Sequence, residues 1–424
     1  MQEDFLHYLW KHKKFELSNL KTTHGAIITI ESVGEHNHHT GPDFFNGKLK
    51  IGEQLWAGNV EIHIKSSDWY VHNHETDANY DNVILHVVWE YDTQVFRKDN
   101  TEIPTLELKR YVSIEALNNY QKLFGKAQKW INCDKDFETV DTFVINHWLE
   151  RLYFERLERK AQDISTLLEQ SKNDWEAVLF KLLAKNFGLK VNKDAFASIA
   201  NSFNFSIVRK QQDNLESLEA LFFGQGELLD DDIQDTYYLG LLKEYTFLKQ
   251  KFNVSSHSVT PLQFFRLRPP NFPTIRLSQL AKLYHTQQNL FSKVIAAKNL
   301  DAFYALFSVG TSTFWETHYT FSKPSKASKK KLTKGFIDLL LINTIIPIQF
   351  SYAKQQGKII NEDVLKLIEQ ISSEKNSIVE KFNDLKPVAT SALQSQALIQ
   401  LKTEYCDKNK CLQCAIGNAL LSPS

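Results

Sequence analysis

The pattern of apolar and polar positions along the chain changes near Tyr111. Before this residue, short runs of β-branched and aromatic residues separated by polar turns predict strands. Ahead of the strands, the segment from Glu3 to His12 has apolar residues at helical spacing. A helix followed by strands predicts a mixed α/β domain over residues 1–125. The predicted strands are Ala26–Val33, Phe44–Ile51, Leu55–Lys65, Val83–Glu90 and Glu102–Leu108.

From Asp141 onward the apolar positions recur every three to four residues, which is the period of an amphipathic helix. A proline-rich segment near residues 260–275 interrupts this pattern, because proline lacks the backbone donor that a helix needs. We therefore predict an all-α domain over residues 140–424, split near 260–275 into two subdomains, and an α+β protein as a whole. Besides the helix that starts near Asp141, helices are predicted over residues 173–187, 237–251, 276–297, 329–355, 361–384 and 390–404.

Composition and charge narrow the classes of protein that fit. Of the 424 residues, 42% are hydrophobic and 24% charged, as in ordinary globular proteins, and the net charge is zero. A protein that binds nucleic acid through bulk charge would be basic, so such binding would need a local patch. The N-terminus lacks a secretory signal, and the longest apolar stretch, Phe336–Phe350, is too short and too polar to span a bilayer. We expect a cytoplasmic protein that is not embedded in a membrane.

Histidines gather at the start of the chain. Ten of the 14 fall within the first 86 residues, where an even distribution would place about three. Such a bias is expected where metal or proton chemistry takes place, although any single histidine is more often part of a polar loop. The ten are His7, His12, His24, His36, His38, His39, His63, His72, His74 and His86.

The most informative group of polar residues is Asp43, Glu61, His63 and Lys65. Alternate residues of a strand share a face, so Glu61, His63 and Lys65 line one side of the predicted strand. If a hairpin turns at Gly52-Glu53, Asp43 lies opposite His63 and diagonal to Glu61. Two carboxylates and an imidazole would hold Mg²⁺ or Mn²⁺ with open positions for water and phosphate. Lys65 would stabilise developing negative charge or position water.

The loop that follows this strand adds further polar residues. Asp68, His72 and His74 could complete a metal site or contact a substrate, and His86 lies on the next strand. Trp69 could stack on a base, but an anchor to the core is the more common role for such a tryptophan. An alternative to the carboxylate site is a zinc hydrolase built on His63 and these three histidines, because imidazole ligands favour zinc over magnesium.

The order of Gly41-Pro42-Asp43 followed by Glu61-Ile62-His63 resembles the motif of the PD-(D/E)XK nuclease superfamily. The helix and three strands at the start of the chain are similar to that superfamily's restriction-endonuclease-like core. The resemblance implies a metal held by the Asp and Glu, an acidic residue on the first helix (here Glu3), and cleavage of DNA or RNA phosphodiesters. His63 stands where lysine is usual, so Lys65 would have to substitute for it. The alternative is a degenerate core in a non-catalytic module that binds nucleic acid or protein.

The whole chain also resembles a bacterial family named for domain of unknown function 2851. This likeness implies no established activity. It is carried by the stretches GPDFFNGKL, GNVEIHIKSSDW, YDNVILHVVWE, RPPNFPTIRL and YCDKNKCLQCAIGN.

The four cysteines suggest a second metal site. Cys406, Cys411 and Cys414 have metal-ligand spacing, and Cys133 is the only other cysteine in the chain. Four thiolates would suffice for a structural Zn²⁺ ion or a [4Fe–4S] cluster. Free buried thiols are the alternative.

A run of lysines without an acidic neighbour lies between residues 323 and 334. It could bind a phosphate backbone, although such runs are more often solvated faces. The lysines are Lys323, Lys326, Lys329, Lys330, Lys331 and Lys334.

Overall fold

A computed structural model of the chain describes residues 1–37, 39–125 and 129–421, so His38 lies outside the described residues. The chain forms two compact units and is an α+β protein. The first unit comprises Met1–Trp148, Lys381–Pro387 and Ile399–Ser424, and the second comprises Leu149–Glu380 and Val388–Leu398. The predicted domain boundaries at 125 and 140 therefore differ from the divisions between these units, since the first unit also takes in the cysteine-rich segment.

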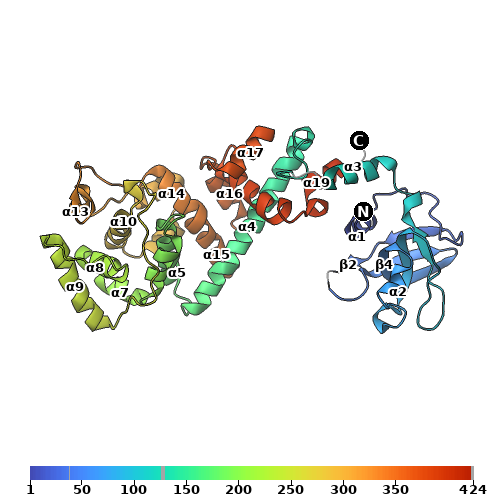
Figure 1. Cartoon of the computed structure of the whole chain (residues 1–424), viewed down its shortest axis with the longest axis horizontal. Helices are drawn as coiled ribbons and strands as arrows, with labels where there is room; N and C mark the ends of the chain where they lie inside the picture. Colours follow the sequence, from blue (N-terminus) through green and yellow to red (C-terminus); the bar gives the residue numbers. More distant parts are fainter. Residues whose placement is uncertain (38, 126–128, 422–424) are drawn as a thin grey trace. The chain divides into compact units, whose positions relative to one another are not determined.

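A six-stranded mixed sheet forms the centre of the first unit (Figure 1). Its strands follow the order β1-β3-β4-β5-β6, and β2 pairs with β3. The pairs β1–β3 and β3–β4 are antiparallel, whereas β4–β5 and β5–β6 are parallel. The strands are β1 (Ile28–Ser32), β2 (Glu35–His36), β3 (Phe44–Ile51), β4 (Gln54–Lys65), β5 (Val83–Glu90) and β6 (Thr105–Glu107).

One face of this sheet is covered by helix α1 (Glu3–Lys11). Phe5, Leu6 and Leu9 of α1 belong to the same buried apolar cluster as Val60 and Ile62 of β4. Because side chains alternate along a strand, this packing turns Glu61 and His63 to the opposite face. The other elements of the first unit are α2 (Asp68–Val71), η1 (Ala78–Tyr80), η2 (Leu108–Arg110), α3 (Ile114–Phe124), η3 (Phe137–Thr139), η6 (Leu401–Cys406), η7 (Cys411–Gln413) and α19 (Ala415–Leu421).

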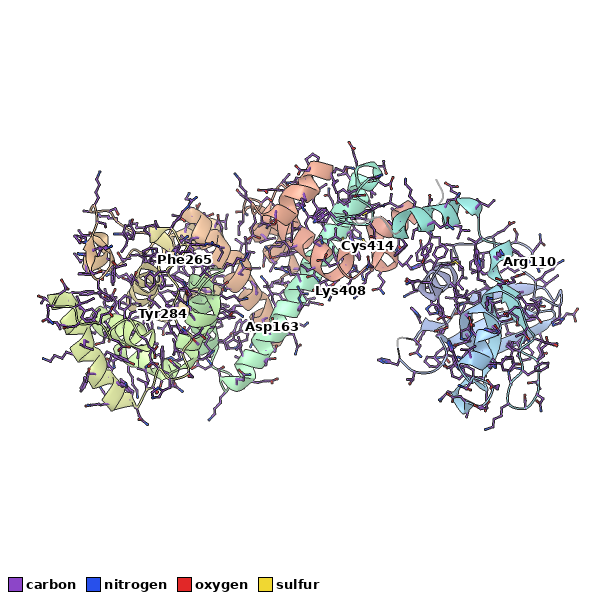
Figure 2. All side chains as sticks on the ribbon, in the orientation of Figure 1. Arg110, Asp163, Phe265, Tyr284, Lys408 and Cys414 are labelled. Carbon is purple, nitrogen blue, oxygen red and sulfur yellow. The ribbon has the colours of Figure 1, made fainter. Side chains whose placement is uncertain are left out.

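The second unit consists mainly of helices. Its aromatic core includes Tyr284, which is 2% exposed and packs edge-on against Phe180, and Figure 2 labels its position. Three helices, α4 (Thr142–Gln170), α17 (Ser377–Leu385) and α18 (Ala392–Gln400), contribute residues to both units. The remaining helices are α5 (Trp175–Phe187), α6 (Lys193–Asn201), α7 (Phe205–Gln211), α8 (Leu215–Gln225), α9 (Thr236–Phe252), η4 (Pro269–Asn271), α10 (Pro273–Thr286), α11 (Leu290–Ala296), α12 (Leu300–Leu306), α13 (Thr313–Glu316), α14 (Lys334–Leu340), η5 (Leu341–Ile345), α15 (Ile346–Gln355) and α16 (Asn361–Glu369); β7 (His318–Thr320) and β8 (Lys323–Pro324) form a small hairpin.

Several predicted helices are divided where the backbone changes direction. The prediction over 276–297 becomes α10 and α11, which are separated at Asn289 by a positive φ of 53°. The prediction over 361–384 becomes α16 and α17, because Ser372 forms a bridge with Ser391 between them. The helices α6, α7 and α8 were not predicted. Helix α8 is buried on nearly every side, so it lacks the alternation of apolar and polar faces from which a helix is predicted.

The apolar segment from Lys334 to Gln355 is one run of 22 helical residues. By length and composition alone this run could cross a membrane; the apolar stretch Phe336–Phe350 is a shorter part of it. However, 72% of its most apolar window is buried inside the protein, as in the core helix of a globular domain. The run contains the π-helical turn η5, which ends two residues before Pro347. Proline lacks a backbone donor, and this accounts for the local change in hydrogen bonding.

A candidate metal centre on the mixed sheet

Strand β4 places two buried polar side chains on the face away from α1. Glu61 is 4% exposed and His63 is 1% exposed. Buried polar groups need partners, and both residues find them among other acidic and imidazole groups. We use the name Glu61 cluster for Glu61, Asp43, His63, His72 and His74.

Asp43 lies immediately before β3 and is held to β4 by two hydrogen bonds, one with Glu61 and one with Ile62. Its backbone N–H donates to Glu61 Oε2 at 3.1 Å, and its own Oδ2 accepts from the N–H of Ile62 at 2.9 Å. The predicted position opposite His63 was wrong. The hairpin pairs Ile51 with Gln54, and an irregularity between Phe44 and Gly47 shifts the register once more, so Asp43 comes beside Glu61.

The loop after β4 brings two further histidines to the same place. Helix α2 is anchored by Trp69, which is fully buried and donates from Nε1 to the Phe96 carbonyl at 3.2 Å. Trp69 is therefore a core anchor in this structure. His72 follows α2 and is exposed, while His74 is 9% exposed and stacks on Tyr80 with 3.7 Å between the ring centroids.

Three imidazoles and one carboxylate oxygen converge in the Glu61 cluster. Glu61 Oε1 lies 3.3 Å from His74 Nε2 and 3.5 Å from His63 Nε2. His63 Nε2 in turn lies 3.1 Å from His72 Nδ1. One ring nitrogen from each of the three histidines lies within 4.8 Å of the others, a spacing at which a single metal ion could be held.

His86 supports this arrangement from the neighbouring strand. It pairs with Glu61 across the parallel β4–β5 ladder, and its Nε2 lies 2.8 Å from His63 Nδ1. This contact occupies one ring nitrogen of His63 and leaves the other facing the cluster. Metal-ligating histidines commonly have their second nitrogen fixed in this way.

The electrostatics of the cluster follow from its burial. Burial raises the pKa of Glu61 to about 9, and the neighbouring Asp43 raises it further in the same direction. Burial lowers the pKa of His63 to about 2, assisted by His86 and His74. Both shifts favour the neutral form of each group. A cation bound here would stabilise the carboxylate form of Glu61.

Helix α1 contributes two polar residues at the edge of the cluster. His7 Nε2 lies 3.2 Å from Asp43 Oδ2. Burial raises the pKa of Glu3, and the negative charge of Asp43 raises it further. This interaction indicates that the Glu3 carboxyl group lies near the same site. Glu3 was considered from the sequence, whereas His7 was noted only as one of many histidines. Its spacing four residues after Glu3, on one face of the helix, was the available signal.

The fourth residue of the predicted catalytic group, Lys65, is exposed. Its backbone N–H donates to Asp68 Oδ2 at 2.9 Å, so Asp68 stabilises the start of the loop. Glu61 thus contacts both Asp43 and His63, and His72, His74 and His7 lie beside these three residues.

The predicted lysine patch is divided by the fold of the second unit. Lys330 is 8% exposed, its ammonium donates to the backbone carbonyls of Trp315 and Glu316, and burial lowers its pKa. It therefore supports the fold and is not available to a phosphate. The other five lysines of the run are exposed.

The cysteines all lie in the first unit, where the four side chains line one cavity. They are free thiols. This site shares no residue with the Glu61 cluster.

Fold and site together define an α+β protein with a buried carboxylate–histidine cluster at one end of a β-hairpin. The chain belongs to the family described as protein of unknown function (DUF2851), whose sequence model matches residues 3–377. The matched range includes the whole Glu61 cluster and Cys133, and it ends before the other three cysteines. No curated protein and no solved structure matches the chain.

Proposed function

We propose that this protein is a divalent-metal-dependent hydrolase that cleaves phosphodiester bonds in DNA or RNA. The observation that carries the proposal is the convergence of Glu61 Oε1 with the ring nitrogens of His63 and His74, at 3.5 and 3.3 Å. His72 completes a set of three imidazoles whose ring nitrogens lie within 4.8 Å of one another.

The donor set favours a transition metal. The imidazole nitrogens of this set suit Zn²⁺ and its carboxylate suits Mn²⁺, whereas Mg²⁺ prefers oxygen ligands and retained waters. The expected ligands are Glu61, His63, His72 and His74. Because His72 is exposed, one side of the site is open to solvent and to a substrate. A metal bound there would polarise a phosphoryl oxygen and offset the charge that develops during cleavage.

The residues around these ligands can move protons. Hydrolysis of a phosphodiester joins a water oxygen to phosphorus and releases the bridging oxygen as a hydroxyl group. One proton must leave the water and one must reach the leaving oxygen. His7 is oriented by Asp43 at 3.2 Å, an arrangement that suits general acid–base work.

The choice of nucleic acid as substrate rests on the arrangement of the acidic residues. A helix acid, an Asp before one strand and a Glu on the next strand lie near one another here, as the resemblance to PD-(D/E)XK nucleases implies. Their positions are Glu3, Asp43 and Glu61. The site departs from that pattern in its imidazoles, since both ring nitrogens of His63 face other histidines. We therefore assign His63 to metal binding and not to the role of the usual lysine.

The first test is calorimetric titration of Mn²⁺ and Zn²⁺ into the full chain and into His72→Ala. His72 is exposed, so its removal should leave the fold intact while it deletes one ligand. We expect about tenfold or weaker binding in the variant. The control is His24→Gln, which changes an exposed histidine paired with Glu102 away from the cluster and should bind metal like the parent.

Cleavage of single-stranded DNA, duplex DNA and RNA would then be compared in the presence of the metal that binds. Metal-stimulated cleavage that is lost in Glu61→Gln supports the proposal. Metal binding without cleavage of any nucleic acid would contradict the substrate and favour a different zinc hydrolase. Nucleic-acid binding that needs neither the metal nor Glu61 would favour a non-catalytic binding module instead.

A further inference from the structure

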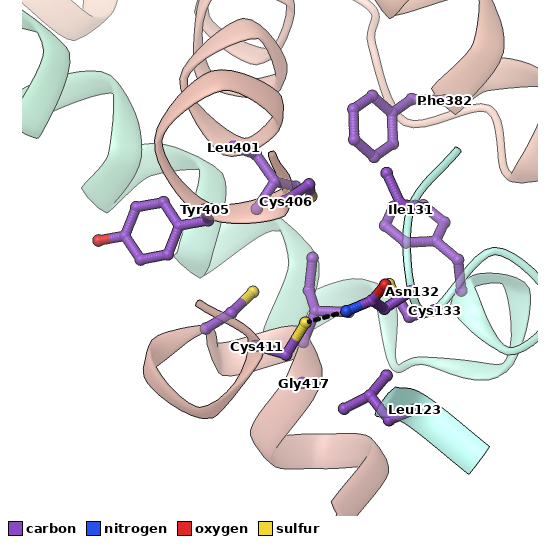
Figure 3. A pocket seen from close by; sticks show the side chains of 13 residues that line it. Leu123, Ile131, Asn132, Cys133, Phe382, Leu401, Tyr405, Cys406, Cys411 and Gly417 are labelled. Atoms are coloured by element: carbon purple, nitrogen blue, oxygen red, sulfur yellow. Dashed lines mark hydrogen bonds between the residues drawn. The ribbon is translucent and has the colours of Figure 1, made fainter. Parts of the chain in front are cut away.

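The four cysteines of the chain converge on one cavity in the first unit (Figure 3). They come from three separate places: Cys133 from the loop before η3, Cys406 from the end of η6, and Cys411 and Cys414 from the turn that leads into α19. The rest of the cavity wall is mostly apolar and includes Phe137, Phe382 and Leu401. That every cysteine of the protein reaches the same cavity indicates a shared ligand.

The spacing of the sulfur atoms separates two kinds of thiolate centre. A single Zn²⁺ ion binds each thiolate at about 2.3 Å, which brings four sulfurs to within roughly 4 Å of one another. Among the residues that the structure describes, no three of these thiols have sulfurs that all lie within 4.8 Å of one another. A four-iron cluster binds one thiolate at each iron and therefore spaces its ligands more widely.

The surroundings of the sulfurs resemble those of metal-bound thiolates. Asn132 donates from Nδ2 to Cys411 Sγ at 3.4 Å, and Figure 3 shows this contact. The backbone N–H groups of Ile416 and Gly417 donate to the Cys414 sulfur. Hydrogen bonds of this kind stabilise thiolate ligands and adjust the potential of an iron–sulfur cluster.

The tight turn that carries two of the ligands depends on a glycine. A Cβ atom at Gly417 would lie 2.1 Å from the Cys411 carbonyl oxygen, so no other residue fits without movement of the backbone. The close approach of α19 to η7 thus holds Cys411 and Cys414 beside the cavity.

Reactive cysteine chemistry does not fit this site. Nucleophilic and redox-active cysteines carry lowered pKa values and are partly exposed. Cys411 and Cys414 are only 9% and 7% exposed, which leaves little access for a substrate thiol.

We propose that Cys133, Cys406, Cys411 and Cys414 together hold a [4Fe–4S] cluster that joins three distant segments of the first unit. This proposal does not depend on the function assigned to the Glu61 cluster, with which it shares no residue.

The test is analysis of the full chain purified without oxygen, and again after incubation with ferrous iron and sulfide. We expect about four iron and four acid-labile sulfide per chain, a broad visible absorbance and an electron paramagnetic resonance signal after reduction. A single tightly held zinc ion without sulfide, or no metal under either condition, would overturn the proposal.

The ligands are tested with Cys406→Ser and with a matched control, Gln413→Ser. Gln413 is exposed and lies between Cys411 and Cys414, so the control changes the same turn without removing a sulfur. We expect Cys406→Ser to lose more than half of its iron and the control to retain it. Circular dichroism and urea unfolding report whether each variant has folded. A folded Cys406→Ser protein with a full complement of iron would contradict the assignment.

Discussion

At the scale of single residues, the relation between His63 and His86 decides how the proposed metal centre is organised. The two rings meet at 2.8 Å through His63 Nδ1 and His86 Nε2. The other nitrogen of His86, Nδ1, is buried and has no hydrogen-bond partner in the part of the chain that the structure describes. A buried ring nitrogen without a hydrogen bond lowers the stability of the fold. The best explanation for a fully buried His86 is therefore that it orients the ring of His63.

This relation predicts different results for two substitutions at His86. His86→Leu removes the partner of His63 Nδ1, so Mn²⁺ should bind about 10- to 100-fold more weakly, since neighbours of metal ligands typically contribute that much. His86→Gln places an amide nitrogen near the same position and should retain most of the affinity. Calorimetry of both variants beside the parent provides the measurement. Equal affinities in all three proteins would show that His86 has no role in metal binding.

At the scale of elements, the β3–β4 hairpin shows what the sequence could predict. The bounds of β3 and β5 were predicted correctly, and alternation along β4 correctly placed Glu61 and His63 on one face. The register between β3 and β4 was not predictable from the sequence, because it depends on an irregularity near Asn46. The positive φ of 58° at Asn46 is set by the packing of the folded protein and not by a local sequence pattern.

The remainder of the candidate site depends on packing between elements. The approach of His72 to His63 requires the fold of the α2 loop, which is fixed by the burial of Trp69. The approach of His7 to Asp43 requires the placement of α1 on the sheet. Neither contact has a local pattern in the sequence, so both histidines could be noted there but not placed relative to the carboxylates.

In the second unit, one buried carboxyl group connects three helices. Glu219 of α8 is 1% exposed and accepts from Ser278 of α10 at 2.5 Å and from Tyr237 of α9 at 2.8 Å. Burial raises its pKa from 4.5 to about 7. The folded protein therefore keeps a proton on Glu219 that the unfolded chain releases above pH 4.5. Its contribution to stability is fully present below pH 4.5 and is lost as the pH rises through 7.

Glu219→Gln should remove this dependence, because the amide keeps the shape of the side chain and cannot ionise. We expect the variant to gain stability relative to the parent between pH 5 and pH 8, by on the order of 2 to 3 kcal/mol. Urea unfolding at both pH values measures the difference. Glu216→Gln on the same helix changes an exposed carboxylate and is the control. A parent and a Glu219→Gln variant with parallel pH profiles would contradict this explanation.

At the scale of the whole molecule, the first unit is built from the two ends of the sequence. Its core contains Phe5 and Leu6 of α1 together with Leu421 of α19. The family match ends at residue 377, yet the unit that contains the Glu61 cluster also includes residues beyond 399.

Leu421→Ala should therefore destabilise the metal-binding unit although it lies 360 residues from Glu61 in the sequence. Leu421 is 3% exposed, and truncation of a buried leucine typically costs about 2 to 5 kcal/mol. The urea concentration at which Mn²⁺ binding is lost is the measurement. Ala419→Ser, at an exposed position of the same helix, should leave this concentration unchanged. An unaffected midpoint in Leu421→Ala would show that α19 does not stabilise the sheet.

The discontinuous first unit also has a consequence for synthesis of the protein in the cell. The sheet leaves the ribosome early, but Leu421 follows roughly 270 residues after Trp148, which at about 5 to 20 residues per second takes roughly 15 to 55 seconds. During that interval the apolar surface that α19 will cover remains exposed on the nascent chain. Such an interval favours binding by chaperones, and it makes the rate of translation a determinant of how much protein reaches the native state.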